Sequence, residues 1–160
     1  MADDLTPPAN DLYARDYVAW TEAQAAALRA RGAGPTALDH DTLAGEIEDL
    51  GKSEVYACQS MVERIIEHLL KLQFVASPQD HAHWRGELVN FRGQLEDRLS
   101  RTIQNRLLAR RQTLFLRQLK ALSRRELIAD ADRVMSELPD GYSWDQIVDP
   151  DWYPVPSGRG

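Results

Sequence analysis

The chain has 160 residues, of which 43% are hydrophobic and 28% are charged, values typical of one globular domain rather than a disordered segment. Its single cysteine, Cys58, excludes an internal disulfide and fits a reducing cytoplasm. The start, MADDLTPPAND, lacks the basic and apolar regions of a signal peptide, and no apolar stretch approaches the about 18 residues of a membrane span. We therefore expect a cytoplasmic protein.

The first helix is predicted from Asn10 or Asp11, either of which can cap it, to about Arg31. One face carries aromatic and small apolar residues, namely Tyr13, Tyr17, Trp20, Ala27 and Leu28. The stretch from Gly32 to Pro35 should end this helix, since glycine suits a helix C-terminus and proline cannot continue a helix. Residues 1–10 are polar, contain two prolines, and are expected to be flexible.

Residues 39–74 form the central predicted helix. Its apolar residues follow the three-then-four spacing of one helix face: Leu43, Ile47, Leu50, Ala57 (or Cys58), Met61, Ile65 and Leu72. Glu54 and His68 lie on the same face, where the pattern requires apolar residues. Gly51 costs a helix about 1 kcal/mol relative to alanine, which indicates a bend or the close approach of another backbone.

The third helix is predicted from about Gln79 or His81 to Leu99. Ser77-Pro78 precedes it, with serine as the cap and proline in the first helical turn. The residues expected to be buried are Trp84, Leu88, Phe91, Leu95 and Leu99.

Near Ser100 the chain either breaks or continues into a fourth helix. The inner side of that helix carries Ile103, Leu107, Leu114, Leu119 and Leu122. Ser123 to Glu126 has the pattern of a capping box, which predicts a seam between two helices, and the helical pattern then persists to about Leu138.

The C-terminal residues predict a turn, a short helix and an extended tail. Pro139-Asp140-Gly141 is the turn, and Ser143 to Gln146 is a second capping box that starts a helix through Val148. The tail, DPDWYPVPSGRG, is Pro-rich, and Trp152 and Tyr153 should anchor it.

The sequence therefore predicts an all-α fold. We expect a single-domain helical bundle of four to five main helices, with a short C-terminal helix and an extended aromatic and Pro-rich tail. The predicted boundaries are a flexible N-terminus at 1–10, the bundle at 11–154 and a loose tail at 155–160.

Four phrases resemble, in order, the bacterial family catalogued as domain of unknown function 29. They are LAGEIEDLGKSE (43–54), HLLKLQF (68–74), HWRGEL (83–88) and GYSWDQIVDPDWYP (141–154). The resemblance spans nearly the whole chain and implies a compact, usually free-standing all-α protein without an established activity.

The chain departs from the family pattern in three places. The family usually has two acidic residues at Gly45-Glu46, a tryptophan at Leu72, and a proline-bearing break at Ser100-Arg101-Thr102. A site that required the additional carboxylate or the tryptophan would be incomplete in this chain.

The family phrases offer Glu46, Glu48, Glu54 and His68 as site residues. On a straight helix, the 14 residues from Glu54 to His68 span about 21 Å, and about 12 Å separates Glu46 from Glu54. Glu54 and His68 therefore cannot bind one metal ion. Hydrogen-bonded polar groups within the fold are the simpler interpretation of both residues.

Neither a metal nor another cofactor is predicted. Glu-x-x-His, His-Glu-x-x-His and paired cysteines are all missing, and His81 with His83 is a weak signal. Arg64 and His68 are four residues apart, which is similar to the Arg-His pair of small helical ribonucleases. Here the pair lies in the middle of a helix, and pairing of Arg64 with Ser60 or Glu67 explains the presence of this arginine equally well.

Residues 98–125 contain nine basic residues and no acidic one, although the whole chain has a net charge of -6. Arginines sharing one helix face can neutralise phosphates, and the polyanion-binding candidates are Arg101, Arg106, Arg110, Arg117 and Arg124. Phe115 is the only aromatic residue among them. Pairing of this basic helix with the acidic helix at 39–54, in the same molecule or in a dimer mate, is the favoured alternative.

The sequence assigns no activity. It favours a non-enzymatic helical module that binds another protein or a second copy of itself, with no membrane partner. The first alternative is a nucleic-acid-associated regulator that uses the basic helix. The second is a hydrolase or nuclease around Glu46, Glu54, Arg64 and His68.

Overall fold

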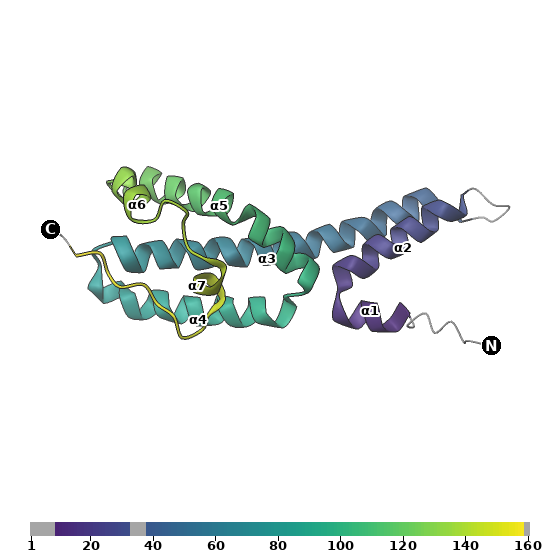
Figure 1. Ribbon diagram of the computed structural model, residues 1–160, viewed down its shortest axis with the longest axis horizontal. Helices are drawn as coiled ribbons and strands as arrows, with labels where there is room; N and C mark the ends of the chain where they lie inside the picture. Colours follow the sequence, from purple (N-terminus) through teal and green to yellow (C-terminus); the bar gives the residue numbers. More distant parts are fainter. Residues whose placement is uncertain (1–8, 33–37, 159–160) are drawn as a thin grey trace. The chain divides into compact units, whose positions relative to one another are not determined.

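The computed structural model describes residues 9–32 and 38–158. Most of these residues are helical and none of them lies in a strand, which confirms the all-α fold class (Figure 1). The elements are α1 (Ala9–Arg15), α2 (Tyr17–Arg31), α3 (His40–Phe74), the 3-10 helix η1 (Pro78–Asp80), α4 (His81–Arg98), α5 (Arg101–Arg124), α6 (Ala131–Glu137) and α7 (Trp144–Val148). None of the described helices combines the length and apolarity that crossing a membrane requires.

The chain forms two compact units. The first contains the described residues up to Ala57 together with Ser100–Arg106, and the second contains Cys58–Leu99 and the residues from Leu107 onward. Helices α3 and α5 therefore contribute residues to both units. The predicted single domain at 11–154, with loose ends, stays a prediction.

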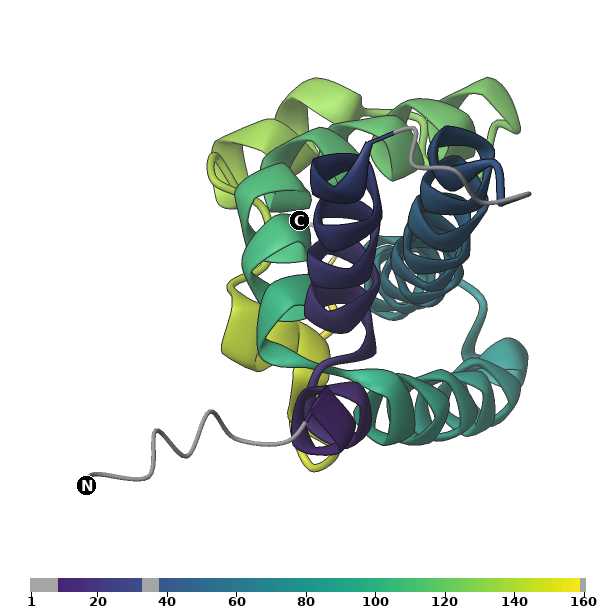
Figure 2. The same ribbon diagram turned by 90° about the vertical axis from the view of Figure 1, so that its right-hand side faces the viewer.

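In the first unit, α2 lies beside the N-terminal part of α3 (Figures 1 and 2). Arg29 of α2 forms an ion pair with Glu48 of α3. The Thr21 side chain lies directly against Gly51, where an added Cβ would overlap the Thr21 hydroxyl. Gly51 therefore permits close packing of the two helices, and α3 continues through it without a break.

The first predicted helix is wrong in one respect, because Asp16 divides it into α1 and α2. One carboxylate oxygen of Asp16 accepts a hydrogen bond from Ala19 N at 3.1 Å and caps α2. The other accepts from Thr102 N at 3.0 Å, in the first turn of α5. Burial opposes ionisation of Asp16, but these hydrogen bonds lower its pKa below the usual value. One carboxylate thus caps two helices of the first unit.

Asp16→Ala is expected to lower the free energy of unfolding by about 2 kcal/mol, because each helix cap contributes about 1 kcal/mol. Asp16→Asn keeps one acceptor oxygen and should lose about half as much. Urea denaturation of both variants measures the difference. A loss below about 0.5 kcal/mol for the alanine variant would show that the caps are not coupled to stability.

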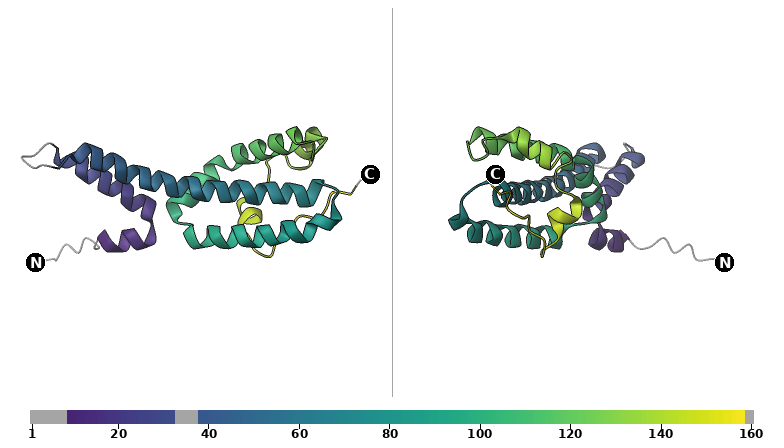
Figure 3. Two further views of the ribbon diagram at one scale, coloured as in Figure 1. Left: turned by 180° about the vertical axis from the view of Figure 1, so that it is seen from behind. Right: turned by 60° about the vertical axis from the view of Figure 1, so that its left-hand side comes forward.

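In the second unit, the C-terminal part of α3 lies between α4 and α5 (Figures 1 and 3). The fully buried α3 residues include Ile65, Ile66, Leu69 and Leu70. The predicted inner residues of α5 that belong to this unit, Leu107, Leu114, Leu119 and Leu122, are confirmed as buried. In α4, Trp84, Leu88 and Leu95 are buried as predicted, but the fourth buried residue is Arg92, and Phe91 is half-buried.

The two predicted capping boxes have different outcomes. The box at the start of α7 is confirmed, since Gln146 N donates to Ser143 Oγ at 3.1 Å and Ser143 N donates to the Gln146 side chain at 2.9 Å. The box at Ser123 is wrong, because Ser123 lies inside α5. There the helix ends with Glu126 at φ 57° and with Leu127 N donating to Leu122 O at 3.1 Å, which is a C-terminal cap.

Glu126→Gly is expected to raise the free energy of unfolding by about 0.5–1 kcal/mol, because glycine adopts positive φ without the steric cost of a Cβ. Ala109→Gly, at an exposed interior position of α5, is the matched control and should lower stability by about 1 kcal/mol. Chemical denaturation compares the two variants. Equal losses in both would mean that the conformation of Glu126 carries no strain.

Candidate functional site

The proposed hydrolase residues are divided between the two units. Glu46 is exposed and Glu54 half-buried in the first unit, whereas Arg64 and His68 belong to the second. Arg64 Nη1 donates to Glu67 at 2.9 Å. His68 Nδ1 lies 2.7 Å from the Arg64 carbonyl oxygen, so Nδ1 must carry the proton. Burial lowers the pKa of His68, which favours the neutral imidazole.

Glu67, which the sequence offered only as a partner of Arg64, forms ion pairs with three basic residues. Its side chain is 6% exposed and accepts from Lys71 at 2.7 Å, Arg64 at 2.9 Å and Arg125 at 3.1 Å. Burial alone would raise the pKa of Glu67, but the hydrogen bonds from Lys71 and Arg64 lower it to about 2. Glu67 is therefore ionised at neutral pH and joins α3 to the end of α5.

Several arginines of the basic helix form hydrogen bonds or ion pairs with other side chains of the protein. In the second unit, Arg110 donates to Gln59 at 2.7 Å and Arg117 donates to Glu63 at 2.6 Å. In the first unit, Arg106 forms an ion pair with Glu22. Of the five polyanion-binding candidates, Arg106 is half-buried and the other four are exposed, namely Arg101, Arg110, Arg117 and Arg124. Acidic partners of the basic residues include Glu22, Glu63 and Glu67, and the expected pairing with the segment 39–54 stays a prediction.

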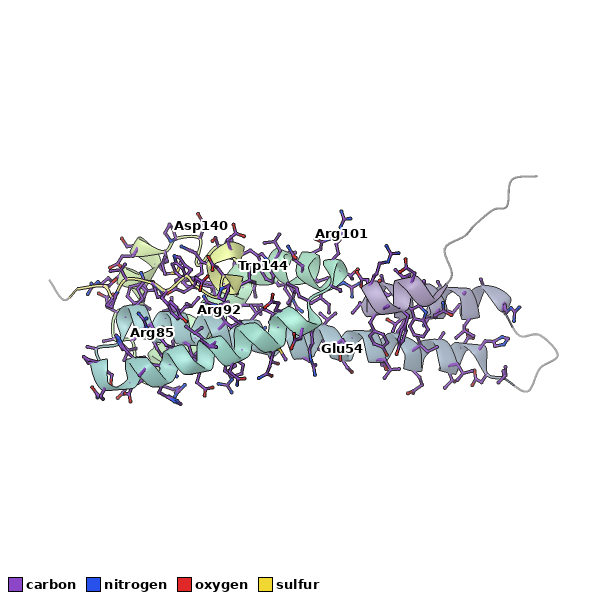
Figure 4. The ribbon with its side chains drawn as sticks, turned by 90° about the horizontal axis from the view of Figure 1, so that it is seen from below. Glu54, Arg85, Arg92, Arg101, Asp140 and Trp144 are labelled. Atoms are coloured by element: carbon purple, nitrogen blue, oxygen red, sulfur yellow. The ribbon has the colours of Figure 1, made fainter. Side chains whose placement is uncertain are left out.

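Arg92 holds the C-terminal segment of the second unit. Its side chain is nearly fully buried and donates three hydrogen bonds, to the carbonyl oxygens of Gln146 at 2.7 Å, Ile147 at 2.9 Å and Trp152 at 2.9 Å. Figure 4 shows Arg92 on α4 beside the segment that carries Trp144. The carbonyls at a helix C-terminus lack partners within the helix, so Arg92 supplies the cap of α7.

Aromatic residues extend this anchoring. The guanidinium of Arg85 lies 4.5 Å from the ring centre of Tyr153 (Figure 4 labels Arg85). The buried Tyr142 hydroxyl donates to Gln73 of α3 at 2.8 Å, and burial raises the pKa of Tyr142. Gly141 precedes Tyr142 and has a φ of 68°. A Cβ at this position would lie 2.7 Å from the Phe115 ring.

Three of the four family phrases therefore meet in the second unit. Gln73 from HLLKLQF contacts Tyr142, and Arg85 from HWRGEL contacts Tyr153. Lys71 also lies 5.9 Å from the ring centre of Trp84. Residues of these phrases join α3 and α4 to the C-terminal segment, and each of these contacts contributes to the packing of the second unit.

The model of the domain of unknown function DUF29 matches residues 12–153. The chain belongs to this family. The crystal structure of an alpha-helical protein of unknown function from Rhodospirillum rubrum ATCC 11170 is similar over 87% of this chain and 90% of that chain, with 26% identity and a TM-score of 0.64. No curated protein matches this DUF29 chain. The family assignment confirms the resemblance and leaves the activity open.

A cavity of about 480 Å³ opens in the second unit of this DUF29 protein, between the end of α3 and α6. Its charged wall residues already have partners: Asp130 accepts from Arg133 N at 2.9 Å, and Arg133 donates to Glu137 at 3.0 Å and to the Gly158 carbonyl at 2.9 Å. His81 also lines it. Ligand sites usually combine apolar walls with convergent polar groups. In this cavity the charged groups named above already bind other residues of the protein.

The first unit has an unusual distribution of side chains. The buried residues of α2 and of the α3 part of this unit are small, namely Val18, Thr21, Ala25, Ala44, Gly51 and Val55. Leu43 and Leu50, predicted to share the apolar face of α3, are 40% and 54% exposed. The buried face of α3 is thus displaced by one residue from the predicted one, so that Leu43 and Leu50 are exposed while Ile47 is half-buried.

Leu43, Glu46 and Leu50 form what we call the leucine face of α3. Their spacing of three and four residues places them on one side of the helix. Glu46 is exposed between the two leucines, so the surface pairs apolar area with a negative charge. Such a surface has the chemistry of a protein contact rather than of a catalytic centre.

Proposed function

We propose that this protein is a non-enzymatic helical module that binds another protein through the leucine face. The observation that carries the proposal is the distribution of side chains in the first unit, where the buried residues of α2 and α3 are small and Leu43 and Leu50 are exposed. Fully burying a leucine stabilises a complex by about 1.5–3 kcal/mol. Two half-exposed leucines on one face therefore supply a useful part of a binding energy.

The engagement of the predicted catalytic residues also favours a binding role. Arg64 pairs with Glu67, and His68 donates to a backbone carbonyl within its own helix. The donation from Nδ1 leaves a lone pair on Nε2, but a general base must come within hydrogen-bond reach of its substrate, and His68 is only 7% exposed. The proposal includes a bacterial, cytoplasmic setting, in agreement with the sequence expectations.

Photo-crosslinking in cells tests this function. A benzoylphenylalanine residue in place of Leu50 should give a discrete adduct, whereas the same residue in place of Val89 should not. Val89 is a suitable control because it is 60% exposed on α4, away from the leucine face. Leu43→Ser should reduce the adduct at position 50. Equal labelling at both positions, or none at position 50, would refute the proposal.

The basic helix supports a second candidate, a nucleic-acid-associated regulator. Lys120 and Arg124 are exposed on α5, and phosphate contacts by such residues make binding strongly salt-dependent. Gel-shift titration at several salt concentrations tests this candidate. A steep decrease of affinity with salt would support it, and the absence of binding or of a salt slope would exclude it.

A further inference from the structure

We infer that the partner of the leucine face is a second copy of this chain, which presents α5. This inference rests on the proposed function, because it names the protein that the leucine face binds. The surface on α5, here called the basic face, consists of Leu108, Leu116, Lys120 and Arg124. Leu108 and Leu116 are 46% and 43% exposed, and both charged residues are exposed.

The basic face has the geometry of a helix-packing ridge. Leu108, Leu116 and Lys120 are separated by eight and four residues, so they lie on one row of the i±4 type. Such rows pack into the grooves of a facing helix. Leu43 and Leu50, seven residues apart, flank a groove of that kind on α3.

Charge selects α5 as the facing helix. The exposed charge of the leucine face is Glu46, and that of the basic face is Lys120 and Arg124. Within the described residues, neither Lys120 nor Arg124 forms an ion pair. Pairing α3 with α3 of a second copy would oppose two acidic helices, and pairing α5 with α5 would oppose two basic ones. Like charges placed together disfavour association, so the complementary pairing of α3 with α5 is preferred.

The size of the surfaces sets the expected strength. Stable dimers bury about 800 Å² on each partner, and two half-exposed leucines with their charged neighbours on each helix provide less. The self-association should therefore be reversible, concentration-dependent and weakened by salt.

Sedimentation velocity over a wide concentration range measures this association. The mass should rise from one copy toward two or more with concentration, and added salt should oppose the rise. Leu50→Ser and Leu116→Ser should each weaken the association constant by about tenfold or more. Val89→Ser, which changes an exposed apolar residue outside both faces, should leave the association constant unchanged.

A charge exchange tests the predicted contact itself. Glu46→Lys and Lys120→Glu should each weaken association, and the chain with both substitutions should recover much of it because complementarity is restored. A single mass of one copy at every concentration would overturn the inference. Association that is insensitive to Leu50→Ser or to Leu116→Ser would overturn it as well.

The photo-crosslinking experiment separates failure of this inference from failure of the proposed function. An adduct at position 50 with the mass of two copies supports both. An adduct with another mass leaves the proposed function standing and overturns the second copy as partner. The absence of any adduct at position 50 removes the basis of both.

Discussion

Arg92→Ala is expected to lower the free energy of unfolding by about 4 kcal/mol, a large part of the stability of an ordinary domain. The substitution removes the donor of three hydrogen bonds, to the carbonyls of Gln146, Ile147 and Trp152. Each buried carbonyl left without a donor costs about 1–3 kcal/mol. Urea denaturation monitored by tryptophan fluorescence measures the loss in the free energy of unfolding.

The geometry of the guanidinium makes a graded series possible. Arg92→Lys keeps the positive charge but cannot reach three carbonyls with a planar fork, so it should lose about half as much stability. Arg85→Ala is the matched control, since Arg85 is exposed and only its contact with Tyr153 is removed, at a cost of about 1 kcal/mol or less. Equal stability of all three variants would contradict the capping role of Arg92.

Glu67→Gln is expected to lower the free energy of unfolding by about 3 kcal/mol at neutral pH. The folded protein holds the pKa of Glu67 at about 2, against an ordinary value of 4.5. Folding therefore favours the ionised form. This stability is fully present above about pH 5 and is lost as the pH falls from 4.5 toward 2.

Denaturation at a series of pH values tests the role of Glu67. The difference between the natural chain and the Glu67→Gln variant should shrink steadily as the pH falls through this range. A difference that is constant with pH would mean that loss of packing, rather than loss of charge, destabilises the variant. Glu63→Gln, which breaks the pair with the exposed Arg117, is the control and should cost about 0–1 kcal/mol.

His68 contributes to the loss of stability in acid at a higher pH than Glu67 does. Burial lowers its pKa from the usual 6.5, so the unfolded chain binds a proton that the folded chain resists. Stability should therefore decrease as the pH falls below 6.5. His68→Gln removes this early decrease and leaves the later one from Glu67, which separates the two groups.

The sequence predicted the helices well because their boundaries have local causes. The buried residues of α5 follow from their spacing, and the start of α7 follows from the capping box at Ser143. The division at Asp16 has a non-local cause, since Asp16 also caps Thr102 of α5. No local pattern reveals a partner 86 residues away.

The buried charges were harder to predict from the sequence. Arg92 lies four residues after Leu88 and three before Leu95, on the buried face of α4, so its position carried the signal. Sequence reasoning selected the neighbouring Phe91 because an arginine is seldom buried without a carboxylate partner. Here backbone carbonyls replace the carboxylate, and those carbonyls come from a segment distant in sequence.

The sequence pattern did not reveal that the leucine face is exposed. Leu43 and Leu50 have the spacing of core residues, yet Ala44 and Gly51, the next residue in each case, are the buried ones. Close packing against Thr21 requires small residues, so the partner helix decides which side of α3 is buried. The spacing alone does not contain that information.

Carbodiimide cross-linking of a mixture of isotope-labelled and unlabelled chains tests the central claim most directly. This reagent joins a carboxylate to an amine only where the two are in contact, and Lys120 is one of few lysines in the chain. The account predicts a linked peptide pair containing Glu46 and Lys120, with one labelled and one unlabelled member. Links at Lys120 that contain only peptides of the same label, or no link to the leucine face, would contradict it.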